Sequence, residues 1–448
     1  MCDWKTKWLP RCYGAAIKRV LRTQLFFLLR CGMLVANEIK LHLPQKAPFL
    51  AFAYLKNNRE VNCMKSNRRF LFYIVVSFFW FSLYAYVPYV TPYADELGAG
   101  LRLMGLIAGA YGLTQMIVRF PLGIFSDRLR RRKIFVQLGI GFAALSGFLA
   151  FFFPSPAMLL VMRAVGGVAA SAWVTFTVLG SSYYGAGEST KVMGNMSAAN
   201  AFGRMVALLA GGLIAQWLGI PYAFLLGGIA GLVGLALSFA VTENRPSEGL
   251  QPPGLAALLD VARNKQLLYC SVLGILAMYI SFATTFGFTP LAAAQMDASQ
   301  FQLGMLGVLS TGPAVFISPL AGTVMPKKLG ASATLVIGFV AAGAGSALVA
   351  VSSSLWMLFA VQIVASLGGA IVGALLLGLC IRDISQEKRA TAMGFFQAVY
   401  GLGMFLGPFA TGHISHGFGL MAAFVFTGAV GLLGAVLAVV FGRRGWKV

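Results

Sequence analysis

Long apolar stretches recur along the chain between Phe70 and Phe441, separated by short polar connections. Each holds about 20 residues, and a helix of that length, rising about 1.5 Å per residue, crosses the roughly 30 Å of hydrocarbon in a bilayer. Backbone polar groups in lipid must pair within the protein, which favours helices. The pattern therefore predicts helical spans near residues 70–92, 103–124, 134–153, 157–181, 193–217, 221–241, 267–292, 301–324, 332–351, 355–380, 391–415 and 420–442.

The composition supports a membrane protein. Hydrophobic residues make up 58% of the 448 residues and charged residues only 11%, whereas a water-soluble domain carries about 25% charged residues. The mean hydropathy is +0.80. We therefore predict an all-α integral membrane protein of twelve transmembrane helices, in contact with the lipid bilayer.

The positive charge is distributed unevenly. The net charge of +22 arises from 35 Lys and Arg against 13 Asp and Glu. After residue 69, the cations gather in alternate connections, such as 128–133 and 326–328, and in the tail at 443–447. Such an asymmetry predicts that these connections and both termini lie in the cytoplasm. We expect a location in the cell (inner) membrane, and no nucleic-acid partner.

The predicted spans fall into two sets of six that resemble each other. Residues 193–234 align with residues 393–434 without a gap, pairing Met193-Gly194 with Met393-Gly394 and Gly203 with Gly403. A repeat with an even number of spans gives both halves the same orientation, related by a pseudo-two-fold axis along the membrane normal. We predict two six-helix bundles, 64–241 and 267–448, joined by a cytoplasmic linker at 242–266.

Residues 1–63 differ from the rest, being basic with only short apolar runs. We expect a disordered or surface-lying extension. A second interpretation is that translation of the native protein starts at Met64. Of the six cysteines, none has metal-site spacing, so we expect free thiols and no metal site.

The connection after the second span has a specific order of residues. It contains one carboxylate among several cations, in the sequence Gly123-Ile124-Phe125-Ser126-Asp127-Arg128-Leu129-Arg130-Arg131-Arg132-Lys133. This tight turn resembles the signature loop of the major facilitator superfamily, with departures at Phe125 and Arg130. The repeat-equivalent loop has Pro326 where Asp127 stands.

The resemblance implies the twelve-helix fold of that superfamily. It also implies a conformational latch formed by Gly123, Asp127, Arg128, Arg131 and Arg132, in which Asp127 faces the start of the eleventh span at 391–393. A carboxylate there would be favoured by the helix dipole.

In span four, Arg163-Ala164-Val165-Gly166-Gly167 resembles a second family pattern, which makes Arg163 a candidate for proton coupling. A purely structural role is the alternative. The proton-antiporter glycine pattern of span five is incomplete, because Ala207-Leu208 replaces its first part.

Charged and polar residues inside the spans indicate a solute site. Arg119, Arg163 and Arg204 lie within spans, whereas no Asp or Glu lies mid-span. An arginine in hydrocarbon costs at least about 2.5–3.5 kcal/mol at the centre on insertion scales, so it should face the protein interior or a cleft. We expect Arg119 to be structural, and we expect the central cleft to be lined by five polar residues and to favour anionic or neutral polar solutes: Gln115, Asn200, Arg204, Gln397 and Tyr400. The alternative for Arg204 is that backbone carbonyls satisfy it.

These features favour a secondary transporter that works by alternating access, coupled to protons and moving a small solute outward. The alternatives are an uptake symporter for a small organic anion and a transporter-like membrane sensor. No phosphate-binding loop of the ATPase type and no acid–base pair within a span occurs in the sequence. We therefore expect no enzymatic activity and no cofactor, and we expect a monomer.

Overall fold

The computed structural model describes residues 68–129, 131–184, 189–243, 262–384 and 388–443, and these ranges are helical with no strand. Eleven of the described helical segments are long and apolar enough to cross a membrane. The predicted all-helical class is confirmed. The extension at 1–63 and most of the linker, 244–261, lie outside the described residues.

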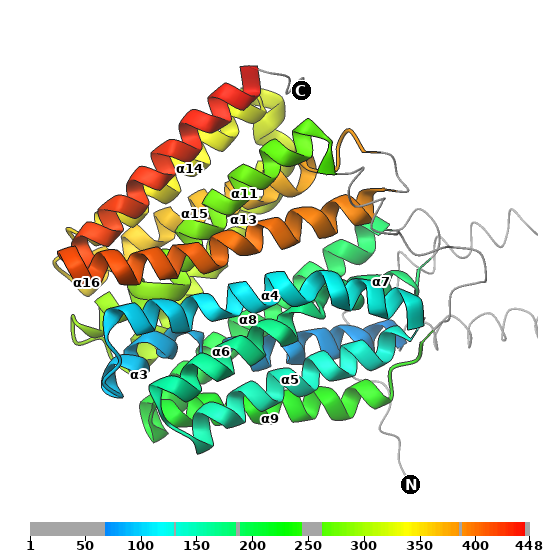
Figure 1. The fold of residues 1–448 in the computed structure, drawn as a ribbon, viewed down its shortest axis with the longest axis horizontal. Coiled ribbons are helices and arrows are strands. Elements are labelled where there is room, and N and C mark those ends of the chain that lie inside the picture. The colour runs from blue at the N-terminus through cyan, green and yellow to red at the C-terminus, as the bar shows by residue number, and fades with distance from the viewer. Residues whose placement is uncertain (1–67, 130, 185–188, 244–261, 385–387, 444–448) are drawn as a thin grey trace, which may run out of the picture. The chain divides into compact units, whose positions relative to one another are not determined.

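The elements follow the predicted spans closely (Figure 1). After a first helix at 68–84, they are η1 (Val87–Tyr89), α3 (Val90–Glu96), α4 (Leu101–Leu129), α5 (Arg132–Phe152), α6 (Pro156–Ser171), α7 (Trp173–Ser181), α8 (Ser189–Leu218), α9 (Ile220–Phe239), α11 (Lys265–Ala283), η2 (Thr284–Phe288), α12 (Thr289–Ala294), α13 (Gln300–Leu329), α14 (Ala331–Val349), α15 (Leu355–Leu379) and α16 (Arg389–Arg443).

Successive membrane-spanning segments run in alternating directions (Figure 1). The connections at 97–100, 153–155 and 219 therefore lie at one end, which we name the Gly219 end. The last residues of α4 and α9 lie at the opposite end, which we name the Arg131 end. These two ends serve below as reference points for the site.

The last apolar segment is much longer than the others. It covers Thr391–Arg443, 53 residues, or about 80 Å of helix, more than twice the thickness of the hydrocarbon. Gly419 interrupts it with a φ of 85°, at the boundary between the predicted spans 391–415 and 420–442, and the chain turns back there (Figure 1). Gly219 pairs with Gly419 in the repeat and has a φ of 104°. Glycine adopts this left-handed conformation without the strain of a Cβ atom.

Two spans predicted to be continuous are instead broken at equivalent places. The segment Arg68–Glu96 is interrupted by the 3₁₀ turn η1, and the segment Lys265–Ala294 by the π-helix η2. Both breaks precede a Thr-Pro pair, at Pro92 and at Pro290. Proline lacks an N–H and its ring clashes with the carbonyl four residues earlier, which disfavours a regular α-helix just before it.

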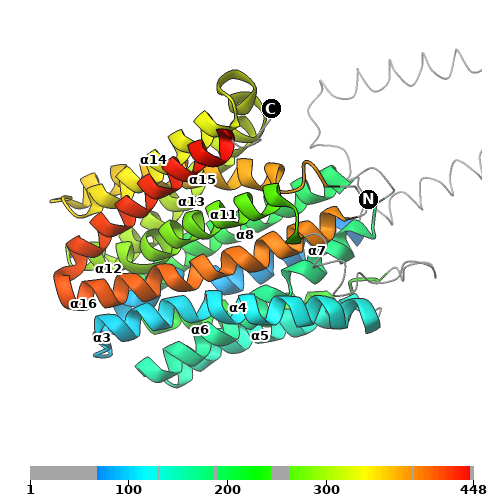
Figure 2. The ribbon, with the colours of Figure 1, turned by 45° about the horizontal axis from the view of Figure 1, so that its top comes forward.

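Two helix pairs, α4 with α16 and α8 with α13, pack closely through glycines. α4 lies along α16 in both views (Figures 1 and 2), and a Cβ atom added at Gly105 would lie 3.0 Å from the Cα atom of Gly412. α8 packs on α13 in the same way, since a Cβ atom at Gly304 would lie 2.9 Å from the Cα atom of Gly212. Gly105 and Gly412 are the repeat equivalents of Gly304 and Gly212, so the two contacts are equivalent too.

The repeat also yields a test of close packing. A Cβ atom added at Gly203 would overlap the carbonyl oxygen of Ser77, and one added at Gly403 would overlap that of Ile275. Gly203→Ala and Gly403→Ala should each destabilise the protein by about 1–3 kcal/mol, because the backbone must shift to admit the methyl group. Thermal unfolding in detergent measures this.

The matched controls come from the same two helices. Gly194 and Gly394 have open space at the Cβ position. Gly194→Ala and Gly394→Ala should therefore leave the midpoint of thermal unfolding unchanged or raise it slightly, since alanine favours helix. Equal midpoints for the four variants would contradict the packing.

Candidate functional site

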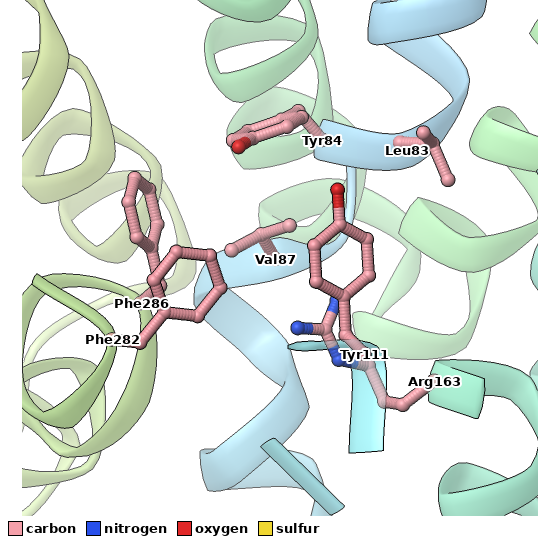
Figure 3. Close-up of a pocket in the computed structure, with 7 residues that line it drawn as sticks. All are labelled: Leu83, Tyr84, Val87, Tyr111, Arg163, Phe282 and Phe286. Carbon is pink, nitrogen blue, oxygen red and sulfur yellow. The ribbon is translucent and has the colours of Figure 1, made fainter. Parts of the chain in front are cut away.

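A small cavity lies where the first helix, α4, α6 and α11 meet, and its volume is about 10 Å³. Such a volume holds about one water molecule. Figure 3 shows Arg163 and Tyr111 on one side and two phenylalanine rings on the other, with Val87 between them. The described residues that line it are Leu83, Tyr84, Val87, Tyr111, Arg163, Phe282 and Phe286.

Arg163, on α6, is the charged group of this cavity. Its side chain is only 4% exposed. The guanidinium carbon lies 4.7 Å from the ring centroid of Tyr111, and Nη2 donates a long hydrogen bond, 3.5 Å, to the carbonyl oxygen of Ala108. Its Nε atom is buried and has no hydrogen-bond partner among the described residues. The titratable groups that interact with it are the tyrosines at 84, 86 and 111.

Arg204, on α8, lies against the same aromatic cluster. Its guanidinium carbon is 4.2 Å from the ring centroid of Tyr84 and 5.8 Å from that of Phe286. Its Nε atom also lacks a hydrogen-bond partner within the described ranges, as does Oδ1 of Asn200, one turn away. The alternative, in which backbone carbonyls satisfy Arg204, has no such partner at Nε among the described residues, and the guanidinium lies over ring faces instead.

Arg119 extends the positive region along α4. Its Nη1 donates to the backbone oxygen of Gln397 at 3.3 Å and to Oε1 of the same residue at 3.2 Å. Tyr111 interacts electrostatically with both Arg119 and Arg163. The three arginines of the spans are therefore linked through Tyr111 and Tyr84 into one positive region, in which Arg119 and Arg163 are buried and Arg204 is half-buried.

The five predicted cleft residues have different neighbours. Arg204 lies over the aromatic cluster, with Asn200 one turn away on α8, whereas Gln397 pairs with Arg119 at the contact between α4 and α16. Tyr400 packs edge-on against Phe396 at 5.3 Å. Gln115 is 5% exposed, and its Oε1 has no partner in the described part of the chain. None of the five lines the small cavity among the residues described for it.

The sequence reasoning missed the aromatic wall formed by Tyr84, Tyr111, Phe282 and Phe286. Aromatic residues are frequent in spans, and no spacing distinguishes these four. It also missed Gln362, which is fully buried and donates from Nε2 to Oγ1 of Thr285 at 2.7 Å. The repeat could have indicated Gln362: Ser155 and Ser354 cap α6 and α15 equivalently, and that register pairs Arg163 with Gln362.

The connection predicted to form the latch is shorter in the structure, because its first part belongs to a helix. α4 continues to Leu129, so Gly123, Asp127 and Arg128 are helical and only 130–131 connect it to α5. The backbone N–H of Arg132 donates to the carboxylate of Glu243. Arg128 and Arg131 are exposed. The side chain of Asp127 lies outside the described part, so its predicted role at 391–393 stays a prediction.

Near the latch, Tyr183 ties the end of α7 to the end of α9. Its hydroxyl donates to the carbonyl oxygen of Thr242. Burial, followed by the charge of Glu243, raises the pKa of Tyr183 to about 12. The hydroxyl therefore keeps its proton at neutral pH and remains a donor. Arg69 donates to the backbone oxygen of Tyr183 at 2.8 Å, which adds the first helix to this group.

The two repeat-related helix pairs differ toward the Arg131 end. α4 and α16 touch from Gly105 and Gly412 as far as Arg119 and Gln397. α8 and α13 meet near the Gly219 end, where Phe301 N–H donates to Oε1 of Gln216 at 3.2 Å. Farther along, Val315, three turns beyond Gly304 on the same face of α13, is 56% exposed. The repeat is thus packed asymmetrically.

Comparison with known proteins identifies the class. The family model of the Major Facilitator Superfamily matches residues 70–331 and again 272–445. The chain belongs to this superfamily and is a multi-pass membrane transporter of a small solute. The superfamily consists of carriers rather than enzymes.

Individual relatives extend over most of the chain. An uncharacterized MFS-type transporter of Methanocaldococcus jannaschii, MJ1560, is 23% identical over 360 residues, covering 78% of this chain and 92% of the relative. The inner membrane transport protein YajR of Escherichia coli is 25% identical, covering 80% of this chain and 78% of that protein. The crystal structure of a mutant of the nucleoside transporter NupG has a similar fold, with a TM-score of 0.70 at 14% identity over 83% of this chain and 99% of that one.

The Arg119–Gln397 contact generates a prediction. A hydrogen bond to a charged group contributes about 1.5 kcal/mol, so Arg119→Ala should raise the population in which α4 and α16 separate by up to about tenfold. Met116, which packs beside Gly401, reports on this separation. In protein whose other cysteines are replaced by alanine, maleimide labelling of Met116→Cys should therefore accelerate when Arg119→Ala is added.

The control removes an exposed cation from the same helix. Arg102→Ala should leave the labelling rate unchanged. A rate that rises equally in both variants would show that general loss of charge, rather than this contact, is responsible.

Proposed function

We propose that the chain is a secondary active transporter that exports a small solute by alternating access, driven by a proton gradient. In this proposal twelve transmembrane helices form two six-helix bundles, 64–241 and 267–448, which rock about a central site. The Arg131 end and both termini face the cytoplasm, in keeping with the positive-inside distribution. The protein acts as a monomer in the inner membrane, the location in the name of YajR.

The observation that carries the proposal is the position of Arg163. It is a charge 4% exposed on a membrane helix, and it borders a cavity whose other described lining residues come from the first helix, η1, α4, α11 and η2. Burying an arginine with no carboxylate beside it costs free energy, and charged residues inside membrane spans commonly mark functional sites. A group at the meeting point of the two halves senses whether a solute is present and whether the halves have moved. We therefore assign Arg163 to coupling.

The asymmetry between the helix pairs supports the proposed direction of transport. Leu208 and Gly212 face α13 on α8, and Arg204 continues that face by one turn toward the Arg131 end. At that end the side chain of Val315, on the face of α13 that holds Gly304, is exposed. This asymmetry supports loading of the site from the cytoplasmic end and hence export. The latch of Gly123, Asp127, Arg128, Arg131 and Arg132 would close that end in the other half of the cycle.

Flux through purified protein tests the proposal. Proteoliposomes should release or take up a labelled solute from a panel of 2-naphthoate, glucose and tetraphenylphosphonium, and an imposed pH gradient should alter the rate. A protonophore should abolish that pH effect. No flux of any panel member above protein-free liposomes would contradict transport, and flux insensitive to the protonophore would contradict proton coupling alone.

The role of Arg163 has its own prediction. Arg163→Ala should lower the flux by at least about tenfold, because an interaction of about 1.4 kcal/mol or more is lost at the coupling step. Arg163→Lys should retain part of the activity, since it keeps the charge but loses the planar guanidinium. The control is Arg102→Ala, which removes an exposed cation from the Gly219 end of α4. Unchanged flux in Arg163→Ala at equal expression removes this residue from the mechanism.

A further inference from the structure

The positive region formed by the three arginines of the spans carries more charge than the described residues neutralise. Arg163 interacts with three tyrosines, Arg204 with two ring faces, and Arg119 with an amide and a carbonyl oxygen. No ion pair between these arginines and an Asp or Glu occurs within the described ranges, where the acidic residues lie at helix ends and connections, as at Asp95 and Glu243. Ring faces and neutral acceptors attract a guanidinium but leave its net charge in place.

The unpartnered atoms indicate where a ligand would bind. The Nε atoms of Arg163 and Arg204 are both buried, and neither has a hydrogen-bond partner in the part of the chain that the structure describes. Tyr84 is common to both arginines, because it lines the cavity with Arg163 and stacks beneath Arg204. Two guanidinium donors that share a tyrosine and have N–H groups to spare suit a carboxylate, sulfonate or phosphate.

The remaining lining is apolar and largely flat. Phe282 stands 5.1 Å from Phe286 and 6.1 Å from Tyr111, with the latter pair stacked. Leu83 and Val87 complete the wall (Figure 3). Among these described lining residues the only polar side-chain atoms besides the Arg163 guanidinium are the tyrosine hydroxyls, whereas aromatic faces pack well against a flat hydrophobic body.

We propose that the transported solute is an organic anion with a flat apolar body. Its anionic group binds between the guanidinium groups of Arg163 and Arg204, and its body packs against Tyr84, Tyr111 and Phe286. The proposal rests on the proposed function, since a cavity of about 10 Å³ must widen as the halves move to admit such a solute. It narrows the class of anionic or neutral polar solutes to anions.

The π-helix η2 gives this site a means of adjustment. Phe286 belongs to η2, and Thr285 beside it accepts the hydrogen bond from Gln362. π-Helical turns inside α-helices occur at functional sites, because they hold a wider turn that can revert to α-helix. Such a change would rotate Phe286 relative to Tyr84, its edge-on neighbour at 6.0 Å, and open the space between the two rings.

Binding to purified full-length protein tests the charge requirement. Four probes separate charge from shape: 2-naphthoate, 2-naphthalenemethanol, 2-naphthylmethylammonium and acetate. Isothermal titration in detergent should detect 2-naphthoate, with the alcohol and the ammonium binding at least about tenfold more weakly and acetate not saturating, because only the first combines an anion with the flat body.

Variants locate the site. Arg204→Gln and Arg163→Gln should each weaken 2-naphthoate binding by about tenfold or more, while Arg102→Gln, at the exposed end of α4, should bind like the native chain. Phe286→Ala should weaken 2-naphthoate and leave the response to acetate as it was. Because a variant can misfold, the thermal midpoint without ligand is measured alongside, and Phe286→Leu retains apolar bulk where Phe286→Ala fails to fold.

The outcomes separate this inference from the proposed function. Flux of glucose or tetraphenylphosphonium without binding of 2-naphthoate overturns the inference and leaves the transporter standing. Tight binding of 2-naphthoate that depends on Arg163 and Arg204, but no flux of any solute, supports the site and overturns transport. Equal binding of the anion, the alcohol and the ammonium, unaffected by Arg204→Gln, identifies partition into detergent and overturns the inference.

Discussion

Every guanidinium at the depth of the hydrocarbon loses hydration that the protein must replace, and the acidic residues described here lie too far out to do so. Removing an ion from water costs several kcal/mol per ion even after relaxation. The chain meets this requirement with rings, through Tyr111 for Arg163 and Tyr84 for Arg204, and with the amide of Gln397 for Arg119. The aromatic wall, the contact of α4 with α16 and the small cavity all reflect this need to replace the lost hydration.

The fold was largely predictable, because membrane spans depend on the length and apolarity of segments and both can be seen in the sequence. Where the prediction failed, the cause was local backbone chemistry: Pro92 and Pro290 break helices that hydropathy treats as continuous, and α4 extends to Leu129 because nothing in residues 123–129 stops a helix.

The candidate site was predictable only in its charges. Arg163 and Arg204 stand out in an apolar sequence, whereas Tyr84 and Phe286 are two aromatic residues among many. Their significance comes from contacts between segments about 200 residues apart, which depend on how the helices pack. The pairing of Gln397 with Arg119 rather than with Arg204 has the same origin, since both helix faces looked equally suited to a cleft.

Arg163 and Gln362 occupy equivalent positions in the two repeats, and the difference between them has a consequence for how a ligand is held. A site built from two equivalent repeats would offer an asymmetric molecule two poses of equal energy, related by half a turn. All three arginines of the spans belong to the first repeat, and the positions that correspond to Arg163 and Arg204 in the second are Gln362 and Met404. The two poses therefore differ in energy. A charged solute would bind and cross the protein in one orientation, although the two repeats are nearly symmetric.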